Sequence, residues 1–168
     1  LKKIGHLQTG HVIEVSVPEM IGQFVGETPQ KVLAALQAAV GGGLFIDEAD
    51  GLLSSKTGNG DAYGEQAVTT ILKFMEDNRD NLTIIAAGYP DNMDRFLESN
   101  PGFKSRFSEV ISFHDYKPDE LVQIYLAHAK NADYQLAPEA MLALVEKMNA
   151  APSLFETNFP NGRFVRNL

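Results

Sequence analysis

The order of apolar and polar positions along the chain predicts several strands. Residues His11 to Val17 (HVIEVSV) alternate between apolar and polar side chains and are rich in β-branched residues, a pattern that favours a strand. Two continuous apolar runs follow, GLFID at 43–47 and LTIIAAG at 82–88. Such runs are typical of strands that are buried on both faces of a parallel sheet. A fourth candidate strand is EVISF at 109–113.

Amphipathic stretches between these runs predict helices. One helix is expected from Pro29 to Val40, where Pro29 suits a first helical turn. A second is expected from Tyr63 to Asp77, because its apolar residues recur on one face. The segment 54–64 (SSKTGNGDAYG) is rich in Gly, Ser, Thr and Asn and predicts a loop. Strands that alternate with helices indicate the α/β class with a parallel sheet.

After about residue 114 the strand pattern ends and only helical patterns continue. Two proline-started amphipathic stretches lie at 117–131 and 138–149, and NGRFVRNL at 161–168 opens a third helix. We therefore expect two parts, a large α/β subdomain at 1–114 and a small helical subdomain at 115–168.

Composition narrows the classes of function. The 168 residues include 44% apolar residues, enough for one domain with an appendage, and the net charge of −8 argues against a nucleic-acid partner. The chain has no cysteine, which excludes disulfides and thiolate chemistry and suits a reducing compartment such as the cytoplasm. No apolar run approaches the roughly 20 residues of a membrane span, so we expect no membrane partner. The four histidines lack the spacing of a metal site.

Acidic residues follow the second predicted strand directly. In LFIDE at 44–48, Asp47 could hold the magnesium ion of a bound nucleotide, and Glu48 could polarise the attacking water. The alternative interpretation is a core strand that runs into an acidic turn. The letters DEAD at 47–50 also occur in helicases, but a DEAD-box helicase should carry Ser-Ala-Thr where this chain has AAGY at 86–89.

A lone aromatic residue stands in a glycine-containing stretch before the first predicted helix. Phe24 is followed by Val25 and Gly26. It could be a buried anchor of the core. It could also be an exposed contact that grips an extended polypeptide without reading its sequence.

Basic residues stand in two further stretches. Lys104 and Arg106 lie in NPGFKSRFSEV, and Arg163 and Arg166 lie in NGRFVRNL. Such residues are most often solvated or salt-bridged at the surface. An arginine at a subunit edge can instead act on the γ-phosphate that a neighbouring subunit binds.

The blocks together resemble the CbxX/CfqX group of AAA+ ATPases, which includes red-type rubisco activase and relatives in sporulation and type VII secretion. The matching blocks cover nearly the whole chain in order: GHVIEVS, IGQFVGETPQK, GGGLFIDEAD, YGEQAVTTILKFMEDNRDNL, IIAAGYPDNMDRFLESNPGFKSRF and NGRFVRN. The resemblance implies an ATP-dependent motor, active as a ring, with six subunits expected, that remodels or unfolds a protein client with ATP and Mg²⁺.

The resemblance also assigns roles by position. Asp47 and Glu48 correspond to Walker B, Arg106 to the arginine finger, and Arg163 to the sensor 2 arginine of a helical lid. Phe24, with Val25 and Gly26, corresponds to the pore loop that touches the client. The sensor 1 position, usually a polar residue, falls near Gly88 and Tyr89 in this sequence.

One departure from the group concerns the phosphate-binding loop. The sequence contains no GxxxxGK[ST] motif, so it lacks the backbone N–H groups and the lysine that cradle phosphates. By resemblance, this loop and the family's first strand would precede Leu1 in the chain. In the sheet, that strand would be central and would lie between the strands at 82–88 and 109–113. We therefore expect a fragment that neither binds nucleotide tightly nor hydrolyses it alone. A non-catalytic assembly or adaptor module, derived from a degenerate relative, is the alternative.

Overall fold

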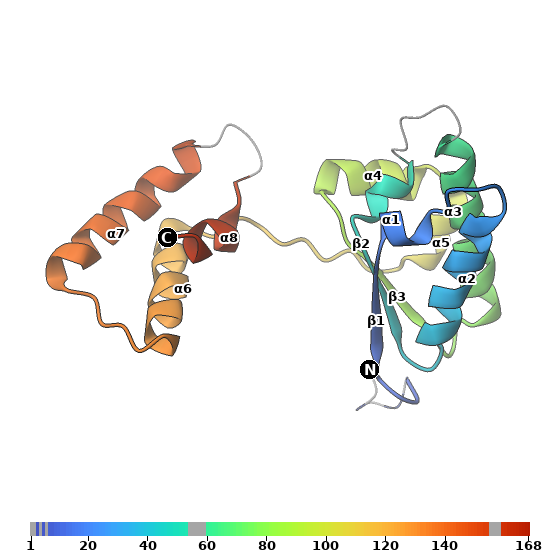
Figure 1. Cartoon of the computed structure of the whole chain (residues 1–168), viewed down its shortest axis with the longest axis horizontal. Coiled ribbons are helices and arrows are strands. Elements are labelled where there is room, and N and C mark those ends of the chain that lie inside the picture. The colour runs from blue at the N-terminus through green and yellow to red at the C-terminus, as the bar shows by residue number, and fades with distance from the viewer. Residues whose placement is uncertain (1–2, 4, 6, 54–59, 155–158) are drawn as a thin grey trace. The chain divides into compact units, whose positions relative to one another are not determined.

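The computed structural model describes residues 3, 5, 7–53, 60–154 and 159–168. The chain divides into two compact units, unit 1 at Leu1–Val110 and unit 2 at Ile111–Leu168 (Figure 1). The division falls within the segment that the sequence pattern assigned to a fourth strand.

Unit 1 is built on a parallel sheet of three strands in the order β1-β2-β3. The strands are β1 (Val12–Ser16), β2 (Gly43–Asp47) and β3 (Thr83–Ala86). In the register, Ser16 lies opposite Asp47 and Ile46 lies opposite Ala86, so all three strands end at the same edge. The α/β class and the parallel sheet predicted from the sequence are confirmed.

Helices follow each strand of unit 1. They are α1 (Val17–Met20), α2 (Glu27–Ala39), the short 3-10 helix η2 (Ala49–Leu53), α3 (Gly60–Asp77), α4 (Pro90–Glu98) and α5 (Pro101–Arg106). The predicted helices at 29–40 and 63–77 correspond to α2 and α3. Of the predicted loop 54–64, residues 54–59 lie outside the described residues, whereas 60–64 form the first turns of α3.

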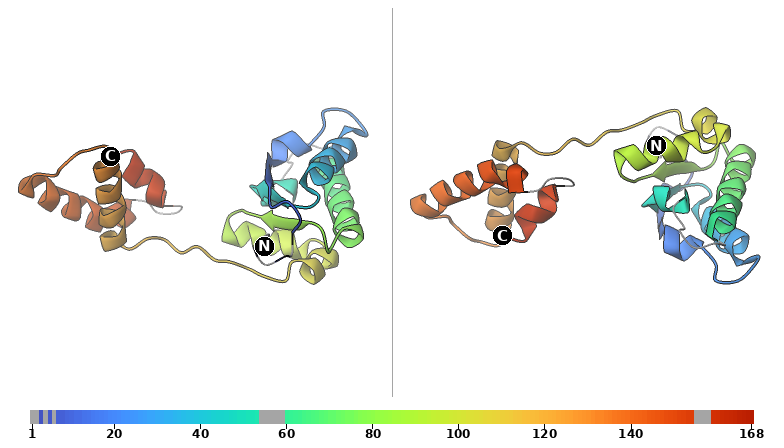
Figure 2. Two further views of the ribbon diagram at one scale, coloured as in Figure 1. Left: turned by 90° about the horizontal axis from the view of Figure 1, so that it is seen from below. Right: turned by 90° about the horizontal axis from the view of Figure 1, so that it is seen from above.

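The core of unit 1 lies between one face of the sheet and helices α2 and α3, which stand on the same side of the sheet in Figures 1 and 2. Leu44 and Ile46 of β2 are fully buried there together with Leu36 and Ile71. Ile85 points to the other face and is 50% exposed. The expectation that both faces of the apolar run at 82–88 are buried is therefore wrong, because α2 and α3 cover one face only.

The predicted strand at 109–113 is also wrong. These described residues form neither strand nor helix, and Val110, Ile111 and Phe113 are largely exposed, Phe113 to 92%. A strand needs a neighbour for its backbone hydrogen bonds. Within the described residues, no strand pairs with this segment or with the outer edge of β3.

Unit 2 is a small helical assembly. It contains α6 (Pro118–Asn131), α7 (Pro138–Ala150), the 3-10 helix η3 (Ala151–Leu154) and α8 (Asn161–Arg166). One residue or two from each of the α-helices form its core, namely Leu121, Leu144, Met148 and Val165. The helices that the sequence predicted after residue 114 are present. None of the helices in the described parts of the chain is long and apolar enough to cross a membrane.

Candidate functional site

The carboxyl ends of the three strands bring the predicted acidic residues to one edge of the sheet. Ile46 is buried in the core, and the next residue, Asp47, ends β2 with an exposed side chain. Ser16 ends the neighbouring strand opposite Asp47. Ligands of open α/β sheets bind in the crevice outside this edge, so Asp47 stands where such a ligand would be met.

Glu48 adopts a backbone conformation that directs the chain out of the sheet. Its φ of 51° lies in the left-handed region, which costs a non-glycine residue roughly 1–3 kcal/mol and often marks functional sites. Its N–H donates to Oδ1 of Asp47 at 3.0 Å. The following N–H, of Ala49, donates to the carbonyl of Ala87 at 2.9 Å. The turn that carries both acids is thereby fixed to the strand beside it.

The acids suit a magnesium–nucleotide complex better than a metal cage made of protein alone. In the described part of the chain, no group of three or more His, Cys, Asp or Glu residues could hold a metal ion. Mg²⁺ is usually bound through one or two carboxylates while phosphates and water supply the remaining oxygens. Asp47, at the strand end, offers such a carboxylate.

Ser16 and Glu19 fix the end of β1 at this edge. The backbone N–H and the hydroxyl of Ser16 donate to Oε2 of Glu19 at 2.7 and 2.8 Å. These two hydrogen bonds, the backbone one first, lower the pKa of Glu19. The ionised carboxylate therefore caps the turn into α1 at neutral pH.

A contact that the sequence did not predict lies behind the acidic turn. Nδ2 of Asn92, in the first turn of α4, donates to Oδ2 of Asp50 at 2.9 Å. Gly88 lies so close that an added Cβ would overlap Oδ1 of Asp50 and stand 2.7 Å from Sδ of Met93. This packing is a structural reason for glycine at position 88, near which the sequence pattern places sensor 1. The neighbouring Tyr89 is exposed and precedes the first residue of α4.

Phe24 lies at the surface, in the turn between α1 and α2, and is 68% exposed. Oε2 of Glu27 accepts the backbone N–H groups of Gln23 and Phe24 at 2.9 and 3.2 Å, and Gly26 has a φ of 86° that suits glycine. Val25 is exposed as well. The alternative that Phe24 is a buried anchor is wrong, because the turn holds the ring outside the core.

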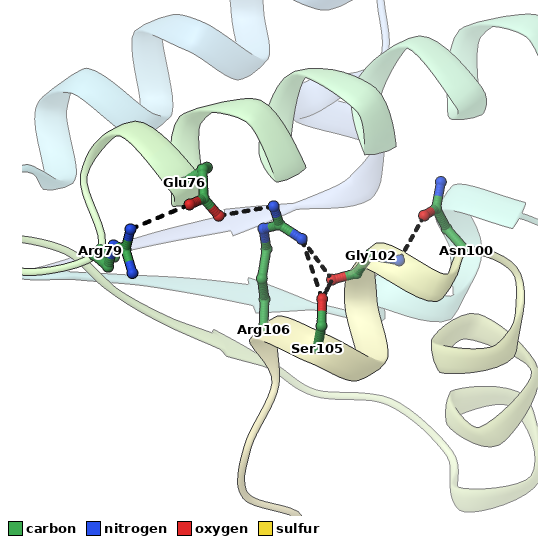
Figure 3. A network of polar contacts seen from close by, with 6 residues as sticks. All are labelled: Glu76, Arg79, Asn100, Gly102, Ser105 and Arg106. Carbon is green, nitrogen blue, oxygen red and sulfur yellow. Dashed lines mark hydrogen bonds and ion pairs between the residues drawn. The ribbon is translucent and has the colours of Figure 1, made fainter.

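Arg106 is the last residue of α5, and its side chain is held by contacts within its own chain (Figure 3). Nη2 of Arg106 lies 2.8 Å from Oε2 of Glu76 on α3. Nη1 donates to the carbonyl of Gly102 and to Oγ of Ser105, both at 3.2 Å. The side chain is 28% exposed, so the guanidinium lies at the surface of unit 1 but is not freely solvated.

The other predicted basic residues differ in their surroundings. Lys104 forms an exposed ion pair with Glu98 at 3.3 Å. Arg163 and Arg166 are exposed on α8 and belong to unit 2. Of the predicted site residues, the fold of unit 1 thus gathers Asp47, Glu48 and Tyr89 at the carboxyl edge of the sheet.

This architecture defines a class of protein. An α/β unit with a parallel sheet, two acids after a buried strand and a following helical unit is the arrangement of AAA+ nucleotide hydrolases. The family "ATPase family associated with various cellular activities (AAA)" matches residues 2–115, and the "AAA lid domain" matches residues 117–168. The chain belongs to the AAA family. This is a different family from the helicases that share the letters DEAD.

Individual relatives support the resemblance to the CbxX/CfqX group within the AAA family. The chain is 43% identical to "Protein CfxQ" of Xanthobacter flavus and 39% identical to "Protein CbbX" of Cereibacter sphaeroides, over 99% of this chain and 51% and 53% of those proteins. It is 40% identical to the chloroplastic "Ribulose bisphosphate carboxylase/oxygenase activase" of Cyanidioschyzon merolae, over 99% of this chain and 56% of that protein. The resemblance to the CbxX/CfqX group is confirmed. The chain spans about half the length of these relatives.

A solved structure supports the fold alone. The crystal structure of the FIGL-1 AAA domain in complex with ADP matches 92% of this chain and 48% of that chain with a TM-score of 0.59, at 18% sequence identity.

Proposed function

We propose that this chain is part of an ATP-dependent motor that remodels or unfolds a protein client. The observation that carries the proposal is the position of Asp47 and Glu48, which leave a buried strand together at the carboxyl edge of the sheet. Membership of the AAA family supports ATP as the nucleotide and Mg²⁺ as its ion. The names of the relatives support a protein client.

Each acid has a separate role in this proposal. A bound magnesium ion would neutralise the charge of the phosphates, and Asp47 would hold that ion. Glu48 would accept a hydrogen bond from the attacking water and orient it. Tyr89, the residue before α4, and Arg163 of the helical lid would contact the nucleotide, with Arg163 reporting whether phosphate is bound.

The active form is proposed to be a homo-oligomeric ring, a hexamer, with each nucleotide at an interface between subunits. Asp47 and Glu48 of one subunit would act with Arg106 of the next, whose guanidinium stabilises the charge that grows in the transition state. The exposed turn with Phe24, Val25 and Gly26 would face the pore and contact the client. We propose the cytoplasm as the location, since the chain has no cysteine.

The 168 residues alone are proposed to be inactive. They contain no GxxxxGK[ST] sequence, so nothing in them supplies the backbone cradle and the lysine that hold phosphates tightly. The proposed activity is therefore tested in a full-length protein that contains these residues together with a phosphate-binding loop.

The test of the motor is the Glu48→Gln variant of the full-length protein. The amide keeps the shape of Glu48 but no longer polarises water, so we expect ATP binding and ring assembly to persist while the rate of hydrolysis falls by about 100-fold or more. Steady-state ATPase rates and nucleotide-binding titrations measure both effects. Glu65→Gln, an exposed glutamate of α3, is the matched control and should hydrolyse ATP normally.

Two other results would count against this function. Undiminished hydrolysis in Glu48→Gln would remove Glu48 from the proposed role. A full-length wild-type protein without ATPase activity would favour the non-catalytic assembly module. Where activity is found, stimulation by candidate clients identifies the substrate, and rubisco is the first to try because one relative is named as its activase.

A further inference from the structure

Arg106 and Glu76 connect two helices that are far apart in the sequence. Glu76 lies in the last turn of α3 and Arg106 at the end of α5, and their side chains meet at 2.8 Å (Figure 3). Arg79 approaches the other oxygen of the same carboxylate at 3.3 Å. The carboxylate of Glu76 is thus shared between two arginines.

The guanidinium of Arg106 is turned toward its own subunit. Nη1 is used by the Gly102 carbonyl and the Ser105 hydroxyl, and Nη2 by Glu76. Nε is buried and has no hydrogen-bond partner within the part of the chain that the structure describes. An arginine grips a phosphate best with two parallel N–H groups. The edge formed by Nε and Nη2 is covered here, so it cannot offer both N–H groups to a phosphate.

We propose that Glu76 is a positioning residue that retains Arg106 on its own subunit until the triphosphate bound by a neighbouring subunit competes for the guanidinium. This inference rests on the proposed function, because it requires Arg106 to act across a subunit interface. Glu76 would then oppose ring assembly slightly and reduce the activity of subunits that have no nucleotide-loaded neighbour.

The contact is weak enough to be released. Glu76 is 52% exposed, and exposed ion pairs are screened by water and salt and hold their partners only weakly. A triphosphate carries more charge than one carboxylate and accepts two parallel hydrogen bonds from arginine, which makes it the stronger partner. An interface that presents triphosphate can therefore displace Glu76.

The backbone under Arg106 does not depend on this ion pair. Oδ1 of Asn100 accepts the N–H of Gly102 at 2.8 Å and caps the start of α5. Phe103 is fully buried, and its ring centroid lies 4.4 Å from that of Phe96. Release of the guanidinium is therefore a side-chain movement on a fixed helix.

The experiment compares Glu76→Gln with wild type in the full-length protein. Ring assembly is measured by sedimentation velocity over a range of protein concentrations, with a non-hydrolysable ATP analogue. We expect the concentration for half-maximal assembly to fall by about 1.5- to 5-fold, the range set by the strength of an exposed ion pair. The ATPase rate at saturating protein concentration should stay the same, because Glu76 no longer holds Arg106 once the ring has formed.

Glu98→Gln is the matched control. Glu98, the last residue of α4, forms an exposed ion pair at 3.3 Å with Lys104, which lies on α5 as Arg106 does. The substitution removes the same charge without touching Arg106. It should leave the assembly concentration unchanged. In an Arg106→Ala background, Glu76→Gln should also have no effect, since its action passes through Arg106.

Three outcomes overturn the inference: an unchanged assembly concentration in Glu76→Gln, a shift that persists without Arg106, or loss of the saturating ATPase rate. The last would mean that Glu76 is needed inside the assembled ring. A different result, normal hydrolysis in Arg106→Ala, would contradict the proposed function itself. Failure of this inference and failure of the proposed function therefore give different experimental results.

Discussion

At the scale of single residues, the acidic turn after β2 combines exposed chemistry with a tightly packed support. Asp47 and Glu48 face outward, while the next acid, Asp50, is held from behind by Asn92 at 2.9 Å. Gly88 closes this contact because its backbone lies against the Asp50 carboxylate. The shape of the proposed catalytic edge thus depends on residues that do not touch nucleotide in the proposed mechanism.

Gly88→Ala should destabilise unit 1. The added methyl group would overlap Oδ1 of Asp50 and crowd Met93, and overpacking of this kind costs about 1–3 kcal/mol. The measurement is the free energy of unfolding in urea. Gly162→Ala in α8 is the control, because an added Cβ there meets nothing within 4 Å. If both variants unfold alike, the close packing around Gly88 does not constrain the turn.

At this scale, the sequence predicts a site residue where residues adjacent in the chain carry the chemistry. The acids Asp47 and Glu48 adjoin an apolar run, so their place at a strand end followed from the chain itself. Glu76 gave no such signal. It stands near the end of an amphipathic helix, and its contact with Arg106 joins positions 30 residues apart.

At the scale of elements, short segments account for most of the differences between the predicted and observed structure. Helices α1, α4 and α5 were not predicted, and they are 4, 9 and 6 residues long. A helical period is hard to recognise over so few residues. The prediction of a strand at 109–113 is wrong for a different reason. Its apolar residues suit a strand, but a strand forms only beside a partner.

The exposed turn between α1 and α2 is predicted to contact the client. Phe24→Ala should leave basal ATPase unchanged, since the Phe24 side chain is exposed and lies outside the acidic edge of the sheet. Client remodelling should fall by about tenfold or more, because a Phe side chain loses its buried apolar contact with the client. Tyr134→Ala, another exposed aromatic, serves as the control. An unaffected remodelling rate would exclude Phe24 from client contact.

At the scale of the whole molecule, the proposed site is divided between subunits. Unit 1 has its acids at the end of β2 and its arginine at the end of α5. In the proposed ring these two features serve two different nucleotides. A homo-oligomer of this kind has head-to-tail interfaces, so every subunit contributes both halves.

Mixed rings test that division. Arg106→Ala and Glu48→Gln should each be inactive alone in the full-length protein. An equal mixture should recover about a quarter of the wild-type ATPase rate, since a site works when an Arg106→Ala subunit supplies the acids and a Glu48→Gln subunit supplies the arginine. The rate is measured after the subunits are exchanged. A mixture as inactive as its components would mean that Arg106 serves its own subunit.

The sequence by itself determined the family, the parallel α/β class and the position of the acids, because apolar periodicity and adjacent motif residues are local properties of the chain. The tertiary structure alone decided that Arg106 pairs with Glu76, that Gly88 packs against Asp50 and that, among the described residues, 109–113 forms no strand. The physical reason is the same in each case. Ion pairs, close packing and strand pairing depend on residues that folding brings together, and the order of letters along the chain does not contain those distances.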